Sequence, residues 1–174
     1  MELNKSKYLS LLLRHKPELA NIELDKEGWA VVSTICTNIN ITIEELESIV
    51  EENDKKRFVF NEDKTKIRAS QGHSINNISI KFDSVSPPQV LYHGTKEEFY
   101  NSIKKDGLIK GKRHHVHLSS DKEIAKEVGD RRKGKTILLE INSMWMKADN
   151  LKFYKSENNV FLTDIVPFKY IKVL

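Results

Sequence analysis

A junction over residues 71–88 divides the chain in two near residues 80–88, and this division constrains the fold more than any other sequence feature. Its first part, from Gln71 to Asn77, is polar. The junction contains Gly72 and ends in Ser84-Val-Ser-Pro-Pro88, which is stiff because proline fixes its own backbone and restricts the residue before it. A length of 174 residues fits one medium domain or two small lobes. We therefore expect one lobe over residues 1–82 and a second over 88–174.

Apolar spacing and helix-stop signals predict three helices in the first part, over residues 6–15, 32–39 and 42–52. Tyr8, Leu11 and Leu12 are spaced as on a helix, and Pro17 ends this first helix because proline cannot donate the next backbone hydrogen bond. Thr42-Ile-Glu-Glu45 is a capping box that opens the third helix. The apolar face of that helix is expected to hold Ile43, Leu46, Ile49 and Val50.

A two-stranded hairpin is predicted to follow these helices. Arg57-Phe-Val-Phe60 and Lys66-Ile-Arg-Ala69 have strand-like composition, and residues 61–65 between them supply polar turn residues. A short turn and strand is also expected over 28–31. Three helices followed by a hairpin are typical of a winged helix, a fold that often contacts nucleic acid but does not by itself establish function.

The second part is predicted to be a small, strand-rich α+β lobe. Strands are expected over residues 90–93, 115–118, 136–141, 151–154, 160–163 and 170–174, and a helix over 121–128. Thr95-Lys-Glu-Glu98 resembles a second capping box, and it predicts a helix to about residue 105. Gly107 follows as the expected left-handed helix stop. The whole chain is therefore assigned to the α+β class.

Composition excludes several classes of protein. With 39% hydrophobic and 31% charged residues, the chain resembles folded globular domains and not disordered ones. It has no run of about 18 apolar residues and no signal-peptide layout, so we expect neither a membrane span nor export. The single cysteine, Cys36, cannot form an intramolecular disulfide. We expect a cytoplasmic monomer, with the oligomeric state left open by the sequence.

Charge is distributed unevenly along the chain. Residues 1–86 carry 12 Lys and Arg against 14 Asp and Glu, whereas residues 87–174 carry 17 against 11. A basic second half suits a polyanionic partner, because Lys and Arg contacts to phosphates release counterions. A solvated surface with a modest lysine excess explains the same numbers, so charge permits RNA binding without demonstrating it.

Two segments of the first part are candidates for binding an anion. Arg14-His15 ends the first helix, where basic residues also complement the helix dipole and need do nothing else. Arg68 alternates with Ile67, so the two side chains leave opposite faces of the strand. A guanidinium binds phosphate oxygens in bidentate fashion, which lysine cannot imitate. The polar residues that follow, Gln71, His73 and Ser74, are either donors to the same ligand or part of a hydrophilic linker.

The second part holds two histidine-containing candidates. Tyr92-His93-Gly94-Thr95 is expected to present an imidazole and backbone amides at a helix N-terminus, which suits an oxygen-rich ligand. Arg113-His114-His115-Val-His117-Leu118-Ser119 has three histidines in four positions, which invites a zinc site. We reject zinc because no cysteine supports it and no Asp or Glu falls at ligand spacing. Alternation instead predicts His115 and His117 on one face and Val116 and Leu118 facing the core.

A basic loop, Gly129-Asp-Arg131-Arg132-Lys-Gly134-Lys, is the last candidate, with an exposed charged turn as its alternative. Other functional classes leave no recognisable motif: the chain has no Walker loop, no Rossmann glycine fingerprint and no serine elbow. Arginine and histidine dominate the candidates, which favours anion recognition over metal-assisted hydrolysis.

Taken in order, these segments match the motifs of a known family. The matching motifs are Ser6 through Pro17, Gly28-Trp29, Ile67 through Ser74, Leu91-Tyr-His-Gly-Thr95, Arg113 through Ser119, and Asn159-Val-Phe-Leu-Thr163. The chain resembles the tRNA 2′-phosphotransferases, NAD⁺-dependent enzymes that erase the 2′-phosphate left at a tRNA splice junction. Each motif is weak alone, and six in sequence are specific. The resemblance implies two lobes, a winged helix and an ADP-ribosyltransferase fold.

The resemblance also implies a two-step reaction. The RNA 2′-phosphate attacks the anomeric carbon of the NAD⁺ nicotinamide ribose, nicotinamide leaves, and an ADP-ribosylated RNA phosphate forms. The ribose 2″-hydroxyl then attacks that phosphate and releases RNA with a 2′-hydroxyl and ADP-ribose 1″,2″-cyclic phosphate. NAD is thus consumed as a co-substrate, and no metal is expected. The attacking phosphate is already a dianion, so it needs positioning more than deprotonation.

Site residues follow from the same resemblance. The family's Arg-His-Arg-Arg tetrad corresponds to Arg14, His15, Arg68 and Arg131 as catalytic residues. Contacts to NAD are implied for Tyr92, His93, Gly94, Thr95, His117, Leu118 and Ser119. Contacts to the 2′-phosphorylated, tRNA-like RNA are assigned to Gln71, His73, Ser74, Arg113 and Arg132. His15 either holds the phosphate or assists proton transfer at the 2″-hydroxyl.

The chain departs from the family pattern at the fourth arginine. The family usually shows Gly-x-Arg-x-Gly, and this chain has one residue more between Gly129 and Gly134. Alignment on Gly129 selects Arg131, which we favour, and alignment on Gly134 selects Arg132. Protein ADP-ribosyltransferases of the same fold often use a Glu whose place here is the apolar surroundings of Val160, and a phosphate nucleophile does not need that carboxylate.

Two other functions compete with this interpretation. One is an ADP-ribosyltransferase that modifies nucleic-acid ends or protein with the same NAD lobe. The other is a non-catalytic winged-helix RNA-binding protein. The second is disfavoured because binding alone does not require Arg14 and Arg68, from different elements, to converge.

Overall fold

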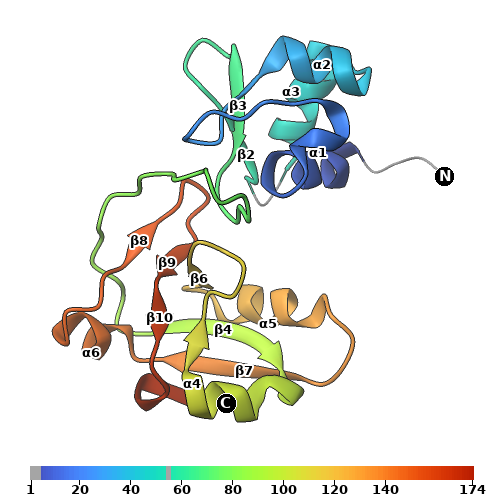
Figure 1. Ribbon diagram of the computed structural model, residues 1–174. Coiled ribbons are helices and arrows are strands. Elements are labelled where there is room, and N and C mark those ends of the chain that lie inside the picture. Colours follow the sequence, from blue (N-terminus) through green and yellow to red (C-terminus); the bar gives the residue numbers. More distant parts are fainter. Residues whose placement is uncertain (1–4, 54–55) are drawn as a thin grey trace. The chain divides into compact units, whose positions relative to one another are not determined.

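A computed structural model describes residues 5–53 and 56–174, and the chain divides into two compact units (Figure 1). Unit 1 spans Met1–Lys81, of which residues 1–4 and 54–55 lie outside the described part, and unit 2 spans Phe82–Leu174. Each unit has its own cluster of buried apolar side chains. Helices are combined with several small antiparallel sheets, so the chain is of the mixed α+β class.

Unit 1 combines helices with a three-stranded antiparallel sheet. Its elements are α1 (Lys5–Arg14), η1 (Pro17–Ala20), β1 (Ala30–Val31), α2 (Val32–Ile39), α3 (Ile43–Glu51), β2 (Phe58–Phe60) and β3 (Lys66–Ala69). The strand order is β1-β3-β2, and Ile67 of the central strand pairs with Ala30 on one side and Phe60 on the other. In the core, the buried side chains of α1 pack in one cluster with Ile35, Leu46 and Phe58.

Most sequence expectations for unit 1 are confirmed, with two corrections. The Thr42 hydroxyl accepts from the Glu45 amide, and the Glu45 carboxylate accepts from the Thr42 amide, as the capping box predicts. Ile43, however, is 53% exposed, because it is the first residue of α3 and lies outside the buried face that Leu46 occupies. The helix predicted from the spacing of Tyr8, Leu11 and Leu12 is present as α1, but its fully buried residues are Leu9, Leu12 and Leu13.

Residues 78–85, around the division between the units, contact the unit to which each belongs. Ser79 donates its amide to the Lys26 carbonyl at 2.8 Å, and Ile78 is buried in unit 1. Val85 donates its amide to the Phe153 carbonyl at 2.9 Å and packs against the core of unit 2. The stretch Ser84–Pro88, which was expected to suit a linker, follows the division between the units at Lys81 and Phe82, and Val85 holds it to unit 2.

Unit 2 contains three small antiparallel sheets and three α-helices in its described residues. Its strands are β4 (Leu91–Lys96), β5 (Leu108–Ile109), β6 (Val116–Leu118), β7 (Thr136–Ile141), β8 (Tyr154–Lys155), β9 (Phe161–Thr163), β10 (Ile165–Val166) and β11 (Ile171–Val173). Its helices are η2 (Glu97–Phe99), α4 (Tyr100–Asp106), α5 (Lys122–Asp130), α6 (Ser143–Ala148) and η3 (Phe168–Tyr170). The sheets have the orders β11-β7-β4, β6-β9-β8 and β10-β5.

Strand β4 is longer than the sequence predicted. It continues through Thr95, which pairs with Ile137 of β7, and α4 begins only at Tyr100. The predicted capping box at Thr95 is therefore wrong, because pairing with β7 takes the backbone that a helix start would need. Gly107 ends α4 with a positive φ of 75°, as expected of a helix-stopping glycine. Strands β5 and β10 and helix α6 were not predicted.

Among the described residues, no helix is both long and apolar enough to cross a bilayer.

Candidate functional site

The end of helix α1 contacts a segment far along the chain. Ser74 donates its amide to the Arg14 carbonyl at 3.0 Å, and the Ser74 Oγ atom lies 2.9 Å from His15 Nδ1. His15 and Ser74 are 59 positions apart in the sequence. The structure thus brings together two predicted catalytic residues and one predicted RNA-binding residue, and Ser74 fixes the orientation of the His15 ring.

The Arg14 guanidinium lies over the turn at Gly72. The Nη1 atom is 3.8 Å from the position that a Cβ atom on Gly72 would occupy, and Gly72 has a φ of +88°. The Arg14 Nη2 atom donates to the Arg57 carbonyl at 3.4 Å. The Ser70 amide donates to that same carbonyl at 2.9 Å, so the guanidinium lies beside the end of β3.

Arg68 projects from β3, two residues before Ser70. Its neighbours Ile67 and Ala69 are fully buried, so Arg68 and Ser70 share the opposite face of the strand. The guanidinium carbon lies 4.3 Å from the centroid of the Trp29 ring, which is a cation–π contact. Trp29 was recognised only as part of a motif, and its contact with Arg68 was not predicted.

His73 has a different environment from the one predicted. Its side chain is 2% exposed, and its Nε2 atom lies 3.0 Å from the position that a Cβ atom on Gly28 would occupy. A side chain this buried shapes the protein interior and cannot itself face RNA. Gly28 has a φ of +81°, so His73 packs against a turn that needs glycine.

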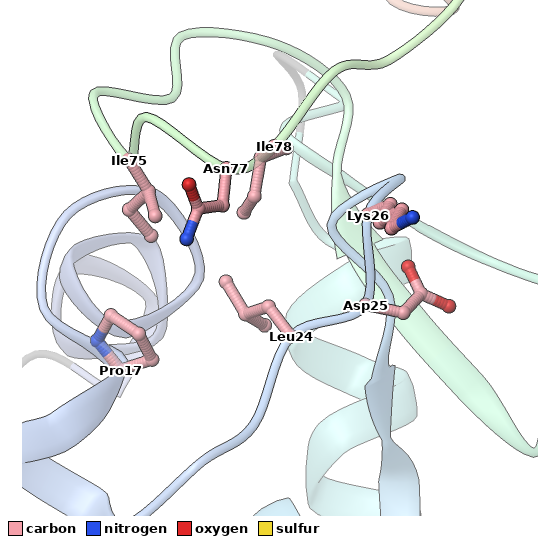
Figure 2. Close-up of a pocket in the computed structure, with 7 residues that line it drawn as sticks. All are labelled: Pro17, Leu24, Asp25, Lys26, Ile75, Asn77 and Ile78. Carbon is pink, nitrogen blue, oxygen red and sulfur yellow. The ribbon is translucent and has the colours of Figure 1, made fainter.

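A pocket of about 520 Å³ lies in unit 1 beside this segment (Figure 2). Its lining is mainly apolar and comprises Pro17, Leu24, Asp25, Lys26, Ile75, Asn77 and Ile78. Figure 2 shows Leu24 on one side and the residues from Ile75 to Ile78 on the other. Ile75 follows Ser74 directly, so one wall of the pocket begins at the residue that holds His15. None of these lining residues was predicted to be part of a site.

In unit 2, two predicted NAD-binding histidines are linked. The His93 Nδ1 atom lies 2.9 Å from the His117 carbonyl oxygen, which can only accept, so His93 carries its proton on Nδ1. Burial lowers the pKa of His93, the bond to the His117 carbonyl partly opposes that shift, and the nearby Arg113 charge adds to it. His93 is therefore a neutral imidazole at neutral pH, with its lone pair on Nε2.

Arg113 contacts His117, and two further arginines lie near Arg113. The Arg113 Nη1 atom donates to His117 Nδ1 at 2.8 Å, which places the ring proton of a neutral His117 on Nε2. The pKa of Arg113 is lowered first by burial and then by the like charges of Arg132 and Arg131. The basic loop after α5 therefore lies near Arg113 and forms with it a concentrated positive site for an anion.

A buried lysine that sequence reasoning missed anchors the basic loop. Lys96 is 3% exposed, and its Nζ atom donates to the Gly134 carbonyl at 2.9 Å and to Thr136 Oγ1 at 2.5 Å. The Glu97 amide also donates to the Lys135 carbonyl at 3.0 Å. The end of the loop after Arg131 and Arg132 is thus fixed to β4.

The predicted NAD-binding segment of β4 is divided between two faces. A Cβ atom on Gly94 would lie 2.0 Å from the Ala125 carbonyl oxygen of α5, so helix backbone covers that face of the strand. His93 and Thr95 point to the other face by alternation. The expectation that His93, Gly94 and Thr95 lie at a helix N-terminus is therefore wrong, because all three lie within a strand.

Leu118 of β6 and His115, which precedes that strand, pack against other side chains of the protein. Leu118 is 2% exposed and belongs to the core, so its side chain cannot reach a ligand. His115 packs against the rings of Phe82 and Tyr154 at centroid distances of 6.0 and 5.6 Å. Val116 is buried like Leu118, which confirms the predicted alternation. Within residues 5–53 and 56–174, no group of three or more His, Cys, Asp or Glu residues is placed to hold a metal ion.

The backbones of β4 and β6 are joined beside these histidines. Tyr92 donates its amide to the Ser119 carbonyl at 2.7 Å, and the Ser119 amide returns a bond to the Tyr92 carbonyl at 2.9 Å. The Ser119 Oγ atom accepts from the Asp121 amide at the start of α5. Both residues are half-buried, so their side chains remain open to contact with a ligand.

The sequence was also compared with known proteins. The model of the family described as "RNA 2′-phosphotransferase, Tpt1 / KptA family" matches residues 1–165. A probable RNA 2′-phosphotransferase of Fusobacterium nucleatum is 52% identical over 176 residues, covering 98% of this chain and 98% of the relative. Probable RNA 2′-phosphotransferases of Flavobacterium johnsoniae and Pseudomonas fluorescens are 53% and 44% identical, covering 96% and 97% of this chain and 93% and 95% of the relatives. The chain therefore belongs to the RNA 2′-phosphotransferase, Tpt1 / KptA family.

Proposed function

We propose that this RNA 2′-phosphotransferase, which transfers a 2′-phosphate to NAD, divides its substrates between its two units. Unit 1 is proposed to hold the internal 2′-phosphate of a tRNA-like RNA, and unit 2 to hold NAD. The observation that carries this proposal is the convergence of Arg14, His15 and Ser74 through two hydrogen bonds between distant segments. These bonds hold a guanidinium-bearing residue and an imidazole at one place, and such groups suit a phosphate ligand.

The folds of the units support this division. In unit 1 three α-helices precede the β2–β3 hairpin, and β1 completes the sheet, which is the arrangement proposed as a winged helix. Unit 2 has the small antiparallel sheets proposed as an ADP-ribosyltransferase-like lobe. All the proposed residues come from one chain, so a monomer is sufficient for the reaction.

In unit 1, we assign phosphate binding to Arg14 and Arg68. Each guanidinium offers a planar set of donors that matches phosphate oxygens. The side chains of Gln71 and Ser74 flank the turn at Gly72 and are assigned as neutral contacts to the RNA. His15, held by Ser74, is the group placed to bind the phosphate or to move a proton at the ribose hydroxyl.

In unit 2, the available donors and acceptors fit NAD. Neutral His93 offers an Nε2 lone pair to a ribose hydroxyl, Thr95 shares its strand face, and Tyr92, His117 and Ser119 lie on or beside the paired strands. Arg113 and Arg132 supply positive charge for phosphate groups. When bound, NAD supplies the acceptor ribose and nicotinamide as the leaving group, and ADP-ribose 1″,2″-cyclic phosphate is the expected final product.

Arg131 is proposed as the fourth catalytic arginine, acting on the charge that grows on the phosphate during transfer. Guanidinium groups provide this neutralisation without a metal ion. We therefore expect activity to persist in the presence of a metal chelator, and loss of activity that added Mg²⁺ restores would contradict this point.

The test is to incubate the protein with a short RNA bearing one internal 2′-phosphate, with and without NAD, and to resolve the products by mass. We expect a 2′-hydroxyl RNA and ADP-ribose 1″,2″-cyclic phosphate only when NAD is present. A stable ADP-ribosylated product without the cyclic phosphate would favour an ADP-ribosyltransferase instead. Unchanged RNA and NAD would leave only RNA binding.

Variants connect the reaction to unit 1. Arg14→Ala and Arg68→Ala are each expected to lower kcat/KM about a hundredfold or more, since each removes a charged donor to the phosphate. Lys16→Ala is the matched control, because Lys16 is an exposed cation two residues beyond Arg14. An equal loss in all three variants would mean that only overall charge matters and would refute the assigned roles.

A further inference from the structure

We propose that Trp29 is a positioning residue for the RNA 2′-phosphate, because its indole ring holds the Arg68 guanidinium in the orientation that receives the phosphate. This inference rests on the proposed function, in which Arg68 binds that phosphate. Trp29 itself touches no reacting atom and acts through Arg68.

Strand register places the two side chains together. Ala30 pairs with Ile67 and Val31 with Lys66, so the same antiparallel register sets Trp29 opposite Arg68. Directly opposed residues in an antiparallel pair project from the same face. The guanidinium carbon accordingly lies 4.3 Å from the Trp29 ring centroid. The contact follows from the pairing of the strands and is not an accident of two flexible surface side chains.

Stacking on an aromatic ring suits an arginine that must bind a phosphate. The ring covers the flat face of the guanidinium, whereas the N–H donors point outward in its plane. The ring therefore leaves the donor edges of the guanidinium uncovered while the group loses freedom to rotate. Less ordering is then left to occur when the phosphate binds, which strengthens binding.

The position of Trp29 is fixed by the turn that precedes it. The Trp29 amide donates to the Asp25 carboxylate at 3.0 Å, and the Asp25 amide donates to the Trp29 carbonyl at 3.0 Å. Gly28 within this turn has a φ of +81° and contacts the buried His73 ring. His73 therefore supports the turn that carries Trp29, a role that needs no contact with RNA.

The first experiment is a double-mutant cycle on the RNA reaction. Trp29→Leu removes the π face, and we expect it to raise the KM for 2′-phosphorylated RNA on the order of tenfold while the KM for NAD stays unchanged. Trp29→Phe keeps a weaker π face and should lie between Trp29→Leu and the wild type. In an Arg68→Ala background, Trp29→Leu should cause no further loss. Phe60→Leu is the control, because the Phe60 ring lies 6.0 Å from Lys64 in the same unit and has no assigned role.

The second experiment is spectroscopic and does not depend on a Leu variant that folds. The chain has two tryptophans, and Trp145 is 66% exposed, so Trp145→Phe leaves Trp29 as the only indole. RNA with a 2′-phosphate should shift Trp29 emission more than the same RNA without it. Arg68→Ala should remove that difference.

The outcomes separate this inference from the proposed function. Wild-type protein that fails to process 2′-phosphorylated RNA would refute the function itself. If the wild type is active but Trp29→Leu and Arg68→Ala act independently, their effects multiplying in the double variant, Trp29 does not position Arg68. Trp29 emission that responds equally to both RNAs would lead to the same conclusion.

Discussion

The Nδ1 atom of His93 on β4 donates a hydrogen bond to the carbonyl oxygen of His117 on β6, 2.9 Å away. Because the carbonyl can only accept, this bond fixes the His93 tautomer and leaves an acceptor at Nε2. Burial lowers the pKa of the ring, so the neutral form persists at neutral pH. One contact between two strands therefore sets the hydrogen-bonding character of a proposed NAD ligand.

Acid should weaken the fold through this histidine. Burial lowers the pKa values of His93 and His115 below the ordinary 6.5, so below about pH 6.5 the unfolded chain binds more protons than the folded one. The free energy of unfolding should therefore fall as the pH drops below about 6.5. Urea unfolding between about pH 5 and pH 8 measures this slope. His93→Gln should reduce the slope, and an identical slope in the variant would contradict the assignment to His93.

Gly94 should tolerate no side chain. A Cβ atom there would lie 2.0 Å from the Ala125 carbonyl oxygen. That oxygen belongs to the backbone of α5, so it cannot swing away as a flexible side chain could. We expect Gly94→Ala to destabilise the protein by about 3 kcal/mol or more. Gly111→Ala is the control, because φ at Gly111 is +60° with open space around it, and its cost should be about 1–2 kcal/mol. Gly94 has no positive φ, so a loss in urea unfolding no larger than that of Gly111→Ala would contradict the predicted clash with α5.

Two similar sequence patterns have different structures in this protein. Thr42-x-x-Glu45 and Thr95-x-x-Glu98 both resemble capping boxes, but only Thr42 caps a helix. Thr95 pairs with Ile137 instead, within six paired residues of β4 and β7. Helix α2 and strand β7, by contrast, have the bounds that were predicted. Local chemistry thus decides an element's type unless a strand distant in sequence competes for the same backbone.

The candidate site was partly predictable for the same reason. Motif resemblance identified Arg14 and His15, and the structure brings them to Ser74. The stacking of Arg68 on Trp29 depends on strand register, which no local pattern contains. The burial of Leu118 and of His73 likewise depends on tertiary packing, which no local pattern contains.

Ser74 should matter through His15. Its Oγ atom lies 2.9 Å from His15 Nδ1, and Ser74→Ala removes the partner that orients the ring. We expect kcat to fall about threefold to tenfold, a typical effect of losing one neutral hydrogen bond, with the KM for NAD unchanged. In a His15→Ala background Ser74→Ala should have no further effect. Ser79→Ala is the control on an exposed residue of the same segment. An increase in the KM for RNA alone would instead make Ser74 a direct contact to the substrate.

The basic loop offers a choice between Arg131 and Arg132 that kinetics can settle. The like charges of Arg132 and Arg131 both lower the pKa of Arg113, after the larger effect of burial, and we propose that Arg132 joins Arg113 in binding the substrate anion while Arg131 is catalytic. Arg131→Ala should therefore lower kcat about a hundredfold or more, whereas Arg132→Ala should chiefly raise KM. Lys133→Ala, a change of charge in the same exposed loop, should leave both parameters near their wild-type values. A collapse of kcat in Arg132→Ala with Arg131→Ala nearly intact would mean that the loop aligns with its family on Gly134, and that the extra residue precedes the catalytic arginine.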